Sequence, residues 1–234
     1  MIYLISSSVF AEKLNIVVGL AKPPYVLQET ESGFEIEFVT QVLALMAKQP
    51  NFVYVPFGRS IRMLEKTDID AIMTVNSNII KDITLLTDIY ITYHNVVITL
   101  KEDQLEINHI NDLSQIPIAA FQTASKILGE EFSKVIKQNN DYYEIADQKR
   151  QVKLLFEKKV KALVIDVNIF KALSKMVNES ADFSNFSVHE VFAESPYRIA
   201  FKNVNNIKGF NAALKTFKGT DKYLALKQKY NVIQ

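Results

Sequence analysis

Two stretches of the chain share one pattern of charged, apolar and polar positions. They are Leu64-Glu-Lys-Thr-Asp-Ile-Asp-Ala-Ile-Met-Thr-Val-Asn76 and, with one gap, Phe156-Glu-Lys-Lys-Val-Lys-Ala-Leu-Val-Ile-Asp-Val-Asn168. In each, a charged helix end leads into a short apolar run that closes on polar residues. Such a run predicts a buried strand of a parallel sheet, and open α/β sheets bind ligands at the carboxyl ends of these strands. The repeat predicts two lobes facing one cleft, unless it reflects only the general pattern of a helix followed by a strand.

The same alternation of apolar runs and helical spacing continues along the chain. Strands are expected over residues 13–20, 51–57, 71–75, 116–121, 142–145 and 162–167. Helices are expected from Gly33 to Pro50, over 60–66 and 125–138, before the second repeat, and near the C-terminus, where they rejoin the first lobe. The β-rich stretch 90–100 with the polar run after it, and the segment 193–196, predict two crossings between lobes.

These crossings divide the chain into a first lobe, 12–97 with 198–234, and a second lobe, 98–197. Residues 1–11 are apolar and end on Val9-Phe10-Ala11, which suits signal-peptidase cleavage before Glu12. The segment lacks a basic start, so a truncated signal peptide and an N-terminal strand both remain open. No other run approaches the roughly eighteen apolar residues of a membrane helix, so the mature chain is expected to be soluble and not to span a membrane.

Composition excludes several classes of function. Of 234 residues, 48% are hydrophobic and 23% charged, which indicates a globular chain, and a net charge of +1 argues against a nucleic-acid binder. The chain has no cysteine, and its three histidines, His94, His109 and His189, lack the spacing of metal ligands. Neither a glycine-rich phosphate loop nor a nucleophile elbow is present. No metal and no cofactor are therefore expected.

Five segments together resemble one protein family. They are Lys13-Leu-Asn-Ile-Val-Val-Gly19 with Pro23-Pro-Tyr25, Gly33-Phe-Glu-Ile-Glu37, Asp68-Ile-Asp-Ala-Ile-Met73, Lys161-Ala-Leu-Val-Ile-Asp166 and Phe217-Lys-Gly-Thr-Asp-Lys-Tyr223. In order and spacing, over residues 13–230, the chain resembles the periplasmic solute-binding proteins of ABC importers, in the family (family 3) that includes polar amino-acid binders. The resemblance implies an α/β, type II periplasmic-binding-protein fold: two lobes, each a mostly parallel sheet flanked by helices, joined by two crossing segments.

The resemblance also implies a function. It describes a periplasmic monomer, not an enzyme, that captures a small polar solute between hinged lobes and presents it to an ABC permease in the inner membrane. Two alternatives remain: a soluble sensor partner of a signalling receptor, and a dehydratase-like enzyme for which Asp166 or Glu194 would be the acid. A ligand drives closure only by contacting both lobes, so the residues of the cleft determine the function.

Polar and aromatic residues at strand ends are the first candidates for ligand contact. Tyr25 follows two prolines, and the resemblance implies that its ring covers the ligand, although packing is an alternative. Thr74 and Asn76 carry ligand-binding hydroxyl and amide groups, or cap the next turn. Asp166 closes an apolar strand, where a carboxylate requires a partner. The resemblance implies a ligand's ammonium group as that partner, and capping of the next helix is the alternative.

A second set of candidates concerns an anionic ligand group. Thr123 and Ser125 lie between a strand and a helix, where N–H groups and hydroxyls can hold a carboxylate, although the family usually has a glycine at the place of Gln122.

The arginine that binds an amino acid's carboxylate in the family is missing from Asn76-Ser-Asn-Ile-Ile-Lys-Asp82. Lys81 and Arg59 are candidate replacements, but lysine lacks the planar two-pronged geometry of guanidinium. Phe57 either walls the cleft or packs in the core. A standard amino acid is therefore expected to be a poor ligand.

Overall fold

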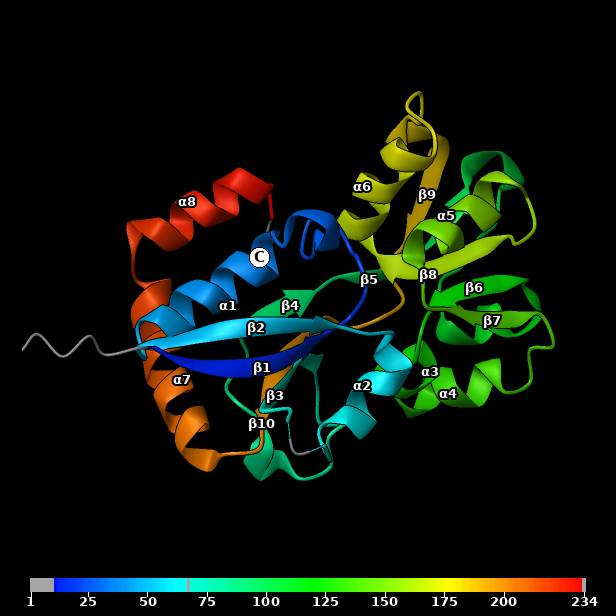
Figure 1. Ribbon diagram of the computed structural model, residues 1–234. Coiled ribbons are helices and arrows are strands. Elements are labelled where there is room, and N and C mark those ends of the chain that lie inside the picture. The colour runs from blue at the N-terminus through cyan, green and yellow to red at the C-terminus, as the bar shows by residue number, and fades with distance from the viewer. Residues whose placement is uncertain (1–10, 67, 233–234) are drawn as a thin grey trace, which may run out of the picture.

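The computed structural model describes residues 11–66 and 68–232, and its ribbon forms two lobes side by side (Figure 1). Each lobe contains a five-stranded sheet, with the orders β2-β1-β3-β10-β4 and β7-β6-β8-β5-β9. In the first sheet all strands run in one direction except β10, and in the second all except β5. The two sheets therefore have the same sequence of strand directions, which confirms the predicted pair of similar, mostly parallel lobes.

The strands divide between the lobes as follows. The first sheet consists of β1 (Glu12–Val18), β2 (Lys48–Tyr54), β3 (Ala71–Val75), β4 (Ile91–Tyr93) and β10 (Ser195–Phe201). The second consists of β5 (Asn95–Leu100), β6 (Ile118–Phe121), β7 (Tyr142–Ile145), β8 (Ala162–Asp166) and β9 (Phe186–His189). Every residue of β3, β6 and β8 is buried. Full burial explains why these strands are almost continuously apolar in sequence.

Helices cover the sheets and fill the connections. The first lobe carries α1 (Phe34–Ala44), α2 (Phe57–Met63), α7 (Val204–Lys218) and α8 (Asp221–Tyr230). The second carries α3 (Ala124–Ile127), α4 (Glu130–Ile136), α5 (Gln148–Phe156) and α6 (Val167–Val177). Short 3-10 helices lie at η1 (Gln28–Thr30), η2 (Ile83–Leu85), η3 (Lys101–Asp103), η4 (Ile110–Gln115) and η5 (Phe183–Asn185). Helices α7 and α8 pack against α1, so the C-terminal helices rejoin the first lobe as expected.

Several element boundaries differ from the expectation, three of them at particular residues. Helix α1 ends well before Pro50, which instead lies in β2 and pairs with Leu14 of β1. Proline is tolerated there because β2 is an edge strand, so one side of its backbone has no partner strand. The helix expected over 125–138 is split into α3 and α4 at Gly129, whose φ is +100°. The stretch 90–100 forms two strands, β4 and β5, separated by His94.

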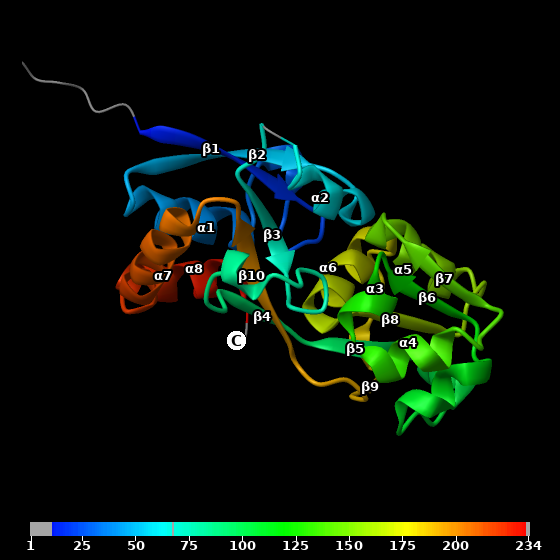
Figure 2. The same ribbon diagram turned by 90° about the horizontal axis from the view of Figure 1, so that it is seen from below.

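Two connections pass between the lobes and run beside each other (Figure 2). One is His94, between β4 and β5, and the other is the segment 190–194, between β9 and β10. The expected lobe boundaries lay at 97/98 and 197/198. Strand pairing passes from one sheet to the other slightly earlier in each case, because Asn95 already pairs with Asp166 and Ser195 with Tyr93. The expected signal peptide, except for Ala11, lies outside the described residues.

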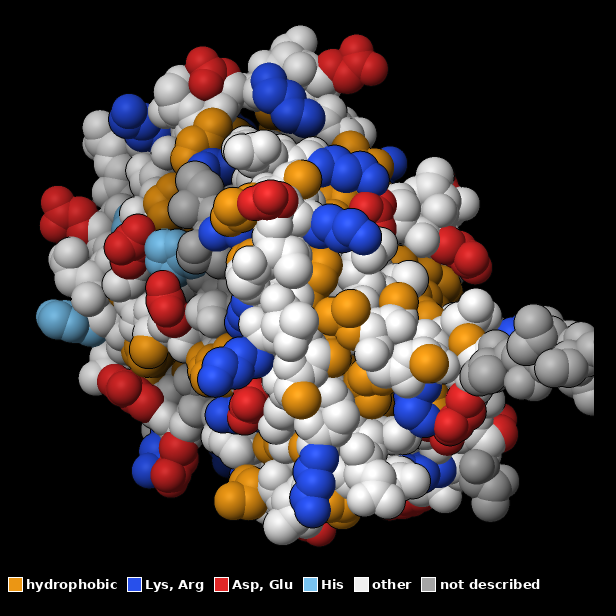
Figure 3. Space-filling view, turned by 90° about the vertical axis from the view of Figure 1, so that its left-hand side faces the viewer, with side chains coloured by type: hydrophobic (Ala, Val, Ile, Leu, Met, Phe, Trp, Pro, Cys, Tyr) orange, Lys and Arg blue, Asp and Glu red, His pale blue; other side chains and the backbone are white. Residues whose placement is uncertain are grey.

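The surface of the first lobe carries both signs of charge. Figure 3 views the molecule from the side of this lobe, and acidic and basic side chains lie interspersed among hydrophobic and neutral polar ones. This mixture agrees with the net charge of +1. Among residues 11–66 and 68–232, no helix has the length and apolar character needed to cross a membrane.

Candidate functional site

A cavity of about 60 Å³ lies between the carboxyl ends of the two sheets. The first lobe contributes Gly19, Leu20, Lys22, Phe57 and Thr74; the segments near the crossings contribute Tyr93, Asn95 and Tyr197; and the second lobe contributes Phe121, Gln122, Ile127, Ala146, Gln148, Asp166 and Ile169. Residues of both lobes line this one cavity. The two lobes are therefore close together in this conformation.

On the first lobe, a buried ion pair lies at the cavity wall. Lys22 follows β1, and its Nζ lies 3.0 Å from Glu35 Oε1, in the first turn of α1. The same ammonium donates to Thr74 Oγ1 over 3.0 Å. Lys22 is 7% exposed and Glu35 is completely buried. A buried charge requires such a partner, and the pair fixes the lysine at the cavity.

Three hydroxyl groups complete the surroundings of Glu35. Thr74 donates to its Oε2 over 2.7 Å, and the phenols of Tyr90 and Tyr93 also donate to the carboxylate. Burial acts to raise the pKa of Glu35, but the Lys22 charge and these donors together hold it below its usual value. Burial and the Glu35 charge raise the pKa values of both tyrosines. The cluster is therefore an ionised acid surrounded by donors.

A backbone irregularity places Thr74 in this cluster. Between the pairs Val75 with Arg198 and Ile72 with Ala200, two residues of β3 lie opposite one residue of β10. The extra residue forms a β-bulge, and Thr74 has a φ of +59°. A β-branched residue rarely adopts this conformation, which costs about 1–3 kcal/mol and is concentrated at functional sites. At this bulge the Thr74 hydroxyl contacts both Lys22 and Glu35.

On the second lobe, Asp166 both caps a helix and lines the cavity. Its carboxylate accepts from the N–H groups of Asn168 (2.9 Å) and Ile169 (3.0 Å) at the start of α6, and from His94 N–H (2.8 Å) at the crossing. Burial raises the pKa of Asp166 to about 6. The capping interpretation of Asp166 thus describes its local contacts. Asp166 also lies in the cavity wall, and its contact with a ligand stays a prediction.

The loop of Thr123 and Ser125, which was expected to hold a ligand's anionic group, binds a carboxylate of the chain itself. Glu144, on β7, accepts from Thr123 N–H over 2.7 Å and from Ser125 N–H over 2.9 Å. The Tyr142 hydroxyl donates to the same carboxylate over 2.9 Å. Thr123 has a φ of +69°, and its hydroxyl is buried without a hydrogen-bond partner among the described residues. The backbone donors of this loop are therefore occupied.

Direct hydrogen bonds join the two lobes. Asn168 Nδ2 donates to the Tyr25 hydroxyl over 3.0 Å, and the Tyr25 ring stacks on Tyr93 with centroids 4.3 Å apart. At the other side of the cleft, Gly58 N–H donates to Gln122 Oε1 over 2.9 Å. Gln122 occupies the place of the family's usual glycine, so its side chain contacts the opposite lobe. These bonds hold the lobes in the closed arrangement.

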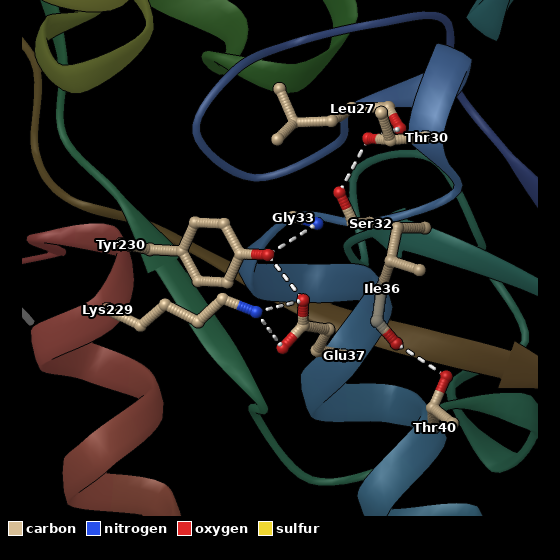
Figure 4. A network of polar contacts seen from close by, with 9 residues as sticks. All are labelled: Leu27, Thr30, Ser32, Gly33, Ile36, Glu37, Thr40, Lys229 and Tyr230. Carbon is tan, nitrogen blue, oxygen red and sulfur yellow. Dashed lines mark hydrogen bonds and ion pairs between the residues drawn. The ribbon is translucent and has the colours of Figure 1, made fainter.

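The C-terminal helix holds the start of α1 in place (Figure 4). Tyr230 on α8 donates to Glu37 and accepts from the Gly33 N–H over 3.1 Å. Lys229 Nζ lies 2.7 Å from Glu37 Oε1. Gly33 has a φ of +115°, and a Cβ there would lie 2.4 Å from the Tyr25 carbonyl oxygen. Helix α8 and this glycine thus position the loop that carries Tyr25 and the helix that carries Glu35.

The predicted site residues fall into three groups. Phe57, Thr74 and Asp166 line the cavity. Tyr25 and Thr123 are buried, Ser125 is half-buried, and Asn76 Nδ2 lies 3.5 Å from the Ile127 carbonyl oxygen across the cleft. Arg59 and Lys81 are exposed and do not belong to the cavity lining. The cation that the structure places at the cavity is Lys22.

Sequence reasoning did not assign a role to several residues of the site. They are Lys22, Glu35, Tyr93, Glu144 and Tyr197. Lys22 did carry a signal, because it stands between the opening strand and two prolines, where a flexible surface lysine is unusual. Among the described residues, no group of three or more His, Cys, Asp or Glu side chains is arranged to hold a metal ion.

Comparison with known proteins identifies this architecture. No family model matches the chain, and no curated protein matches it. Among solved structures, an ancestral arginine-binding protein bound to arginine superposes with a TM-score of 0.76 and 20% identity, covering 94% of this chain and 99% of that one. The chain has the fold of type II periplasmic binding proteins. This finding confirms the fold class predicted from the sequence.

Two further solved structures show the same likeness. A substrate-binding protein of an ABC uptake transporter from Streptococcus pneumoniae, with bound histidine, has a TM-score of 0.74 and 15% identity, over 93% of this chain and 92% of that one. A histidine kinase sensor domain similar to periplasmic binding proteins has a TM-score of 0.77 and 14% identity, over 94% and 96%. At these identities the shared property is the fold.

Proposed function

We propose that this protein is a binding protein that captures a small polar solute between its lobes and presents it to an ABC importer. The observation that carries the proposal is the cavity whose wall is formed by both lobes at the ends of both sheets. A solute there contacts both lobes and therefore binds the closed form more tightly than the open form. The type II fold, shared with an ABC transporter's substrate-binding protein, supports the same function.

Closure in this proposal is a hinge motion about the two connections. The connections are His94 and the segment 190–194, and each links a strand of one sheet to a strand of the other. Asn95 Nδ2 donates to Ser195 Oγ over 2.9 Å, which joins the first residues of the strands that follow the two connections. A hinge of adjacent, mutually bonded segments permits rotation of one lobe against the other while both sheets stay intact.

The proposal locates the protein in the periplasm as a monomer and assigns it no catalytic step. The carboxylate of Asp166 is already engaged by three backbone N–H groups. Glu194, the other acid considered, is exposed and does not line the cavity. Backbone bonds engage the Asp166 carboxylate and Glu194 lies outside the cavity lining, so the proposal gives neither acid the role of a general acid or base.

A sensor role is the second candidate. The observation that favours it is the likeness to a histidine kinase sensor domain, with a TM-score of 0.77 beside 0.76 for the arginine-binding protein and 0.74 for the ABC transporter's substrate-binding protein. The two roles use the same ligand cavity and differ in the protein that recognises the closed form. Deletion of the gene followed by radiolabelled solute uptake separates them, since loss of uptake supports transport and unchanged uptake with a lost transcriptional response supports sensing.

Ligand binding itself is tested on the natively purified protein. Small molecules released by denaturation are identified by mass spectrometry and titrated back by calorimetry. We expect one molecule to bind per chain, and small-angle X-ray scattering to show a smaller radius of gyration with ligand than without. If no released molecule and no fraction of a cell extract binds or compacts the protein, solute capture is excluded.

A further inference from the structure

The described residues that line the cavity offer no unmatched positive charge. Lys22 is the one lysine or arginine among them, and its charge is matched by Glu35 at 3.0 Å. A second N–H of the same ammonium donates to Thr74, which leaves one of its three donors for a ligand. The expected alternatives, Arg59 and Lys81, are exposed outside the lining. A ligand carboxylate would therefore enter the cavity without a cation to neutralise it.

The backbone donors that could compensate for this lack are also taken. Thr123 and Ser125 N–H groups both donate to Glu144, whose carboxylate is held in place by the Tyr142 hydroxyl. A ligand carboxylate could use these donors only by displacing Glu144. Two carboxylates at one site repel, and the displaced one would lose three hydrogen bonds. The chain thus supplies its own acid where an acidic ligand group would otherwise bind.

Two further polar groups of the wall offer hydrogen-bond acceptors. The carboxylate of Asp166 is bonded to backbone N–H groups and to no lysine or arginine. Gln148, on the first turn of α5, lines the cavity, and its side-chain oxygen is buried without a hydrogen-bond partner among the described residues. A buried acceptor without a partner costs about 1–3 kcal/mol, which a ligand N–H would remove. These two acceptors favour a ligand that brings hydrogen-bond donors.

Aromatic rings form much of the rest of the wall. Phe57, Tyr93, Phe121 and Tyr197 line the cavity. Lys22 Nζ already lies 5.0 Å from the centre of the Tyr93 ring, and ring faces attract cations in general. From these contacts we infer that the captured solute is a small organic cation that carries no carboxylate. Its charged group is a primary amine or a guanidine. The inference rests on the proposed function of solute capture and names the chemical class of its ligand.

Matched pairs of compounds test the inference, since each pair differs only in one carboxylate. The pairs are agmatine and arginine, histamine and histidine, and cadaverine and lysine, titrated calorimetrically into protein that was unfolded, dialysed and refolded to remove bound solute. We expect at least one amine to bind, and each binding amine to have an affinity at least about tenfold higher than its amino acid. Equal or tighter binding of the amino acid overturns the inference.

The solute released from natively purified protein gives the second readout. An amine or guanidine without a carboxylate supports the inference. A carboxylate-bearing solute that binds and compacts the protein overturns the inference and leaves solute capture standing. If neither the pairs nor any component of a cell extract binds, solute capture itself fails, and the inference fails with it.

Two variants connect the result to particular residues. Gln148→Met removes the unpartnered acceptor, and we expect about tenfold weaker amine binding, whereas Gln138→Met, at an exposed glutamine outside the cavity, leaves it unchanged. Glu144→Ala frees the Thr123 and Ser125 N–H groups. We expect it to reduce the preference for the amine about tenfold, and Glu131→Ala, at an exposed acid of α4, to leave it unchanged. Unchanged preference and affinity in both test variants contradict the inference.

Discussion

The Lys22 ammonium lies 3.0 Å from the Glu35 carboxylate, and the two side chains form a buried ion pair against the wall of the cavity. Removing one member of a buried pair leaves the other without compensation, which typically costs about 3–5 kcal/mol. We expect Glu35→Gln to lower the free energy of unfolding by about that amount, because Lys22 stays charged and buried. Urea denaturation followed by circular dichroism measures the change.

The control for this variant is an ion pair of the same lobe whose carboxylate is exposed. Lys48 and Glu12 lie 2.7 Å apart at the surface, where water screens the attraction. We expect Glu12→Gln to leave the urea midpoint nearly unchanged. A midpoint for Glu35→Gln that also equals that of the wild type would mean that the buried pair adds nothing to stability.

Stability should depend on pH through Asp166. Burial raises its pKa from 3.8 to about 6, so between these values the folded protein binds more protons at this group than the unfolded chain does. The contribution of Asp166 to stability is therefore fully present below pH 3.8 and is lost as pH rises through 6. Its full size is up to about 3 kcal/mol, since each pKa unit corresponds to about 1.4 kcal/mol.

Asp166→Asn isolates this contribution, because asparagine caps a helix about as well as aspartate but does not titrate. The amide NH2 cannot accept the His94 N–H, a loss that is the same at every pH. We expect the stability of the variant relative to that of the wild type to rise as pH increases from 4 through 6. Urea unfolding at several pH values gives both curves. Parallel curves for the two proteins would show that Asp166 is not the group responsible.

The bond between Asn168 and the Tyr25 hydroxyl should favour the closed form. Asn168→Ala removes this contact between the lobes, and we expect ligand affinity to fall about threefold to tenfold, the range of one net hydrogen bond. Small-angle scattering of the ligand-free variant should show a larger radius of gyration. Asn51→Ala, which removes a 2.8 Å bond to Asn15 within the first lobe, is the control and should change neither quantity.

Tyr230 should control the stability of the loop before α1. Tyr230→Phe removes the hydroxyl that bonds Glu37 and the Gly33 N–H, and we expect a loss of about 1–2 kcal/mol in the free energy of unfolding. Hydrogen exchange of the Gly33 amide should become faster, because its acceptor is gone. Tyr143→Phe is the control, since that side chain is 50% exposed, and protection of Gly33 equal to that of the wild type in both variants would contradict the assignment.

The strands and lobes were predictable because their signals are local. The strands over 71–75 and 142–145 have the bounds read from the sequence. The run over 71–75 is buried throughout, and such an apolar run ending at polar residues records burial directly. Breaks inside a continuous pattern were not predictable. Gly129 ends α3 by its backbone conformation, and Pro50 is accepted in β2 because that strand is at an edge of the sheet.

The site was predictable in position but not in its contacts. Polar residues at strand ends marked the cleft, and Thr74 and Asp166 do line the cavity. The Glu144 contact with Thr123 and the Lys22 contact with Glu35 join residues 21 and 13 positions apart, and depend on the way strands and helices pack. Such pairings leave no spacing pattern in the sequence, so the occupied donors and the matched cation could be found only from the structure.

The antiparallel pairing of Tyr93 with Ser195 makes the second lobe removable. The residues between these two positions form one continuous segment of the chain, and the two ends of this segment lie side by side in the first sheet. A hairpin turn can join antiparallel neighbours, so an excised half-molecule would keep the whole first sheet and the helices on it. It would also retain Lys22, Glu35, Thr74, Tyr90 and Tyr93 together, on the side of the first lobe that the second lobe no longer covers.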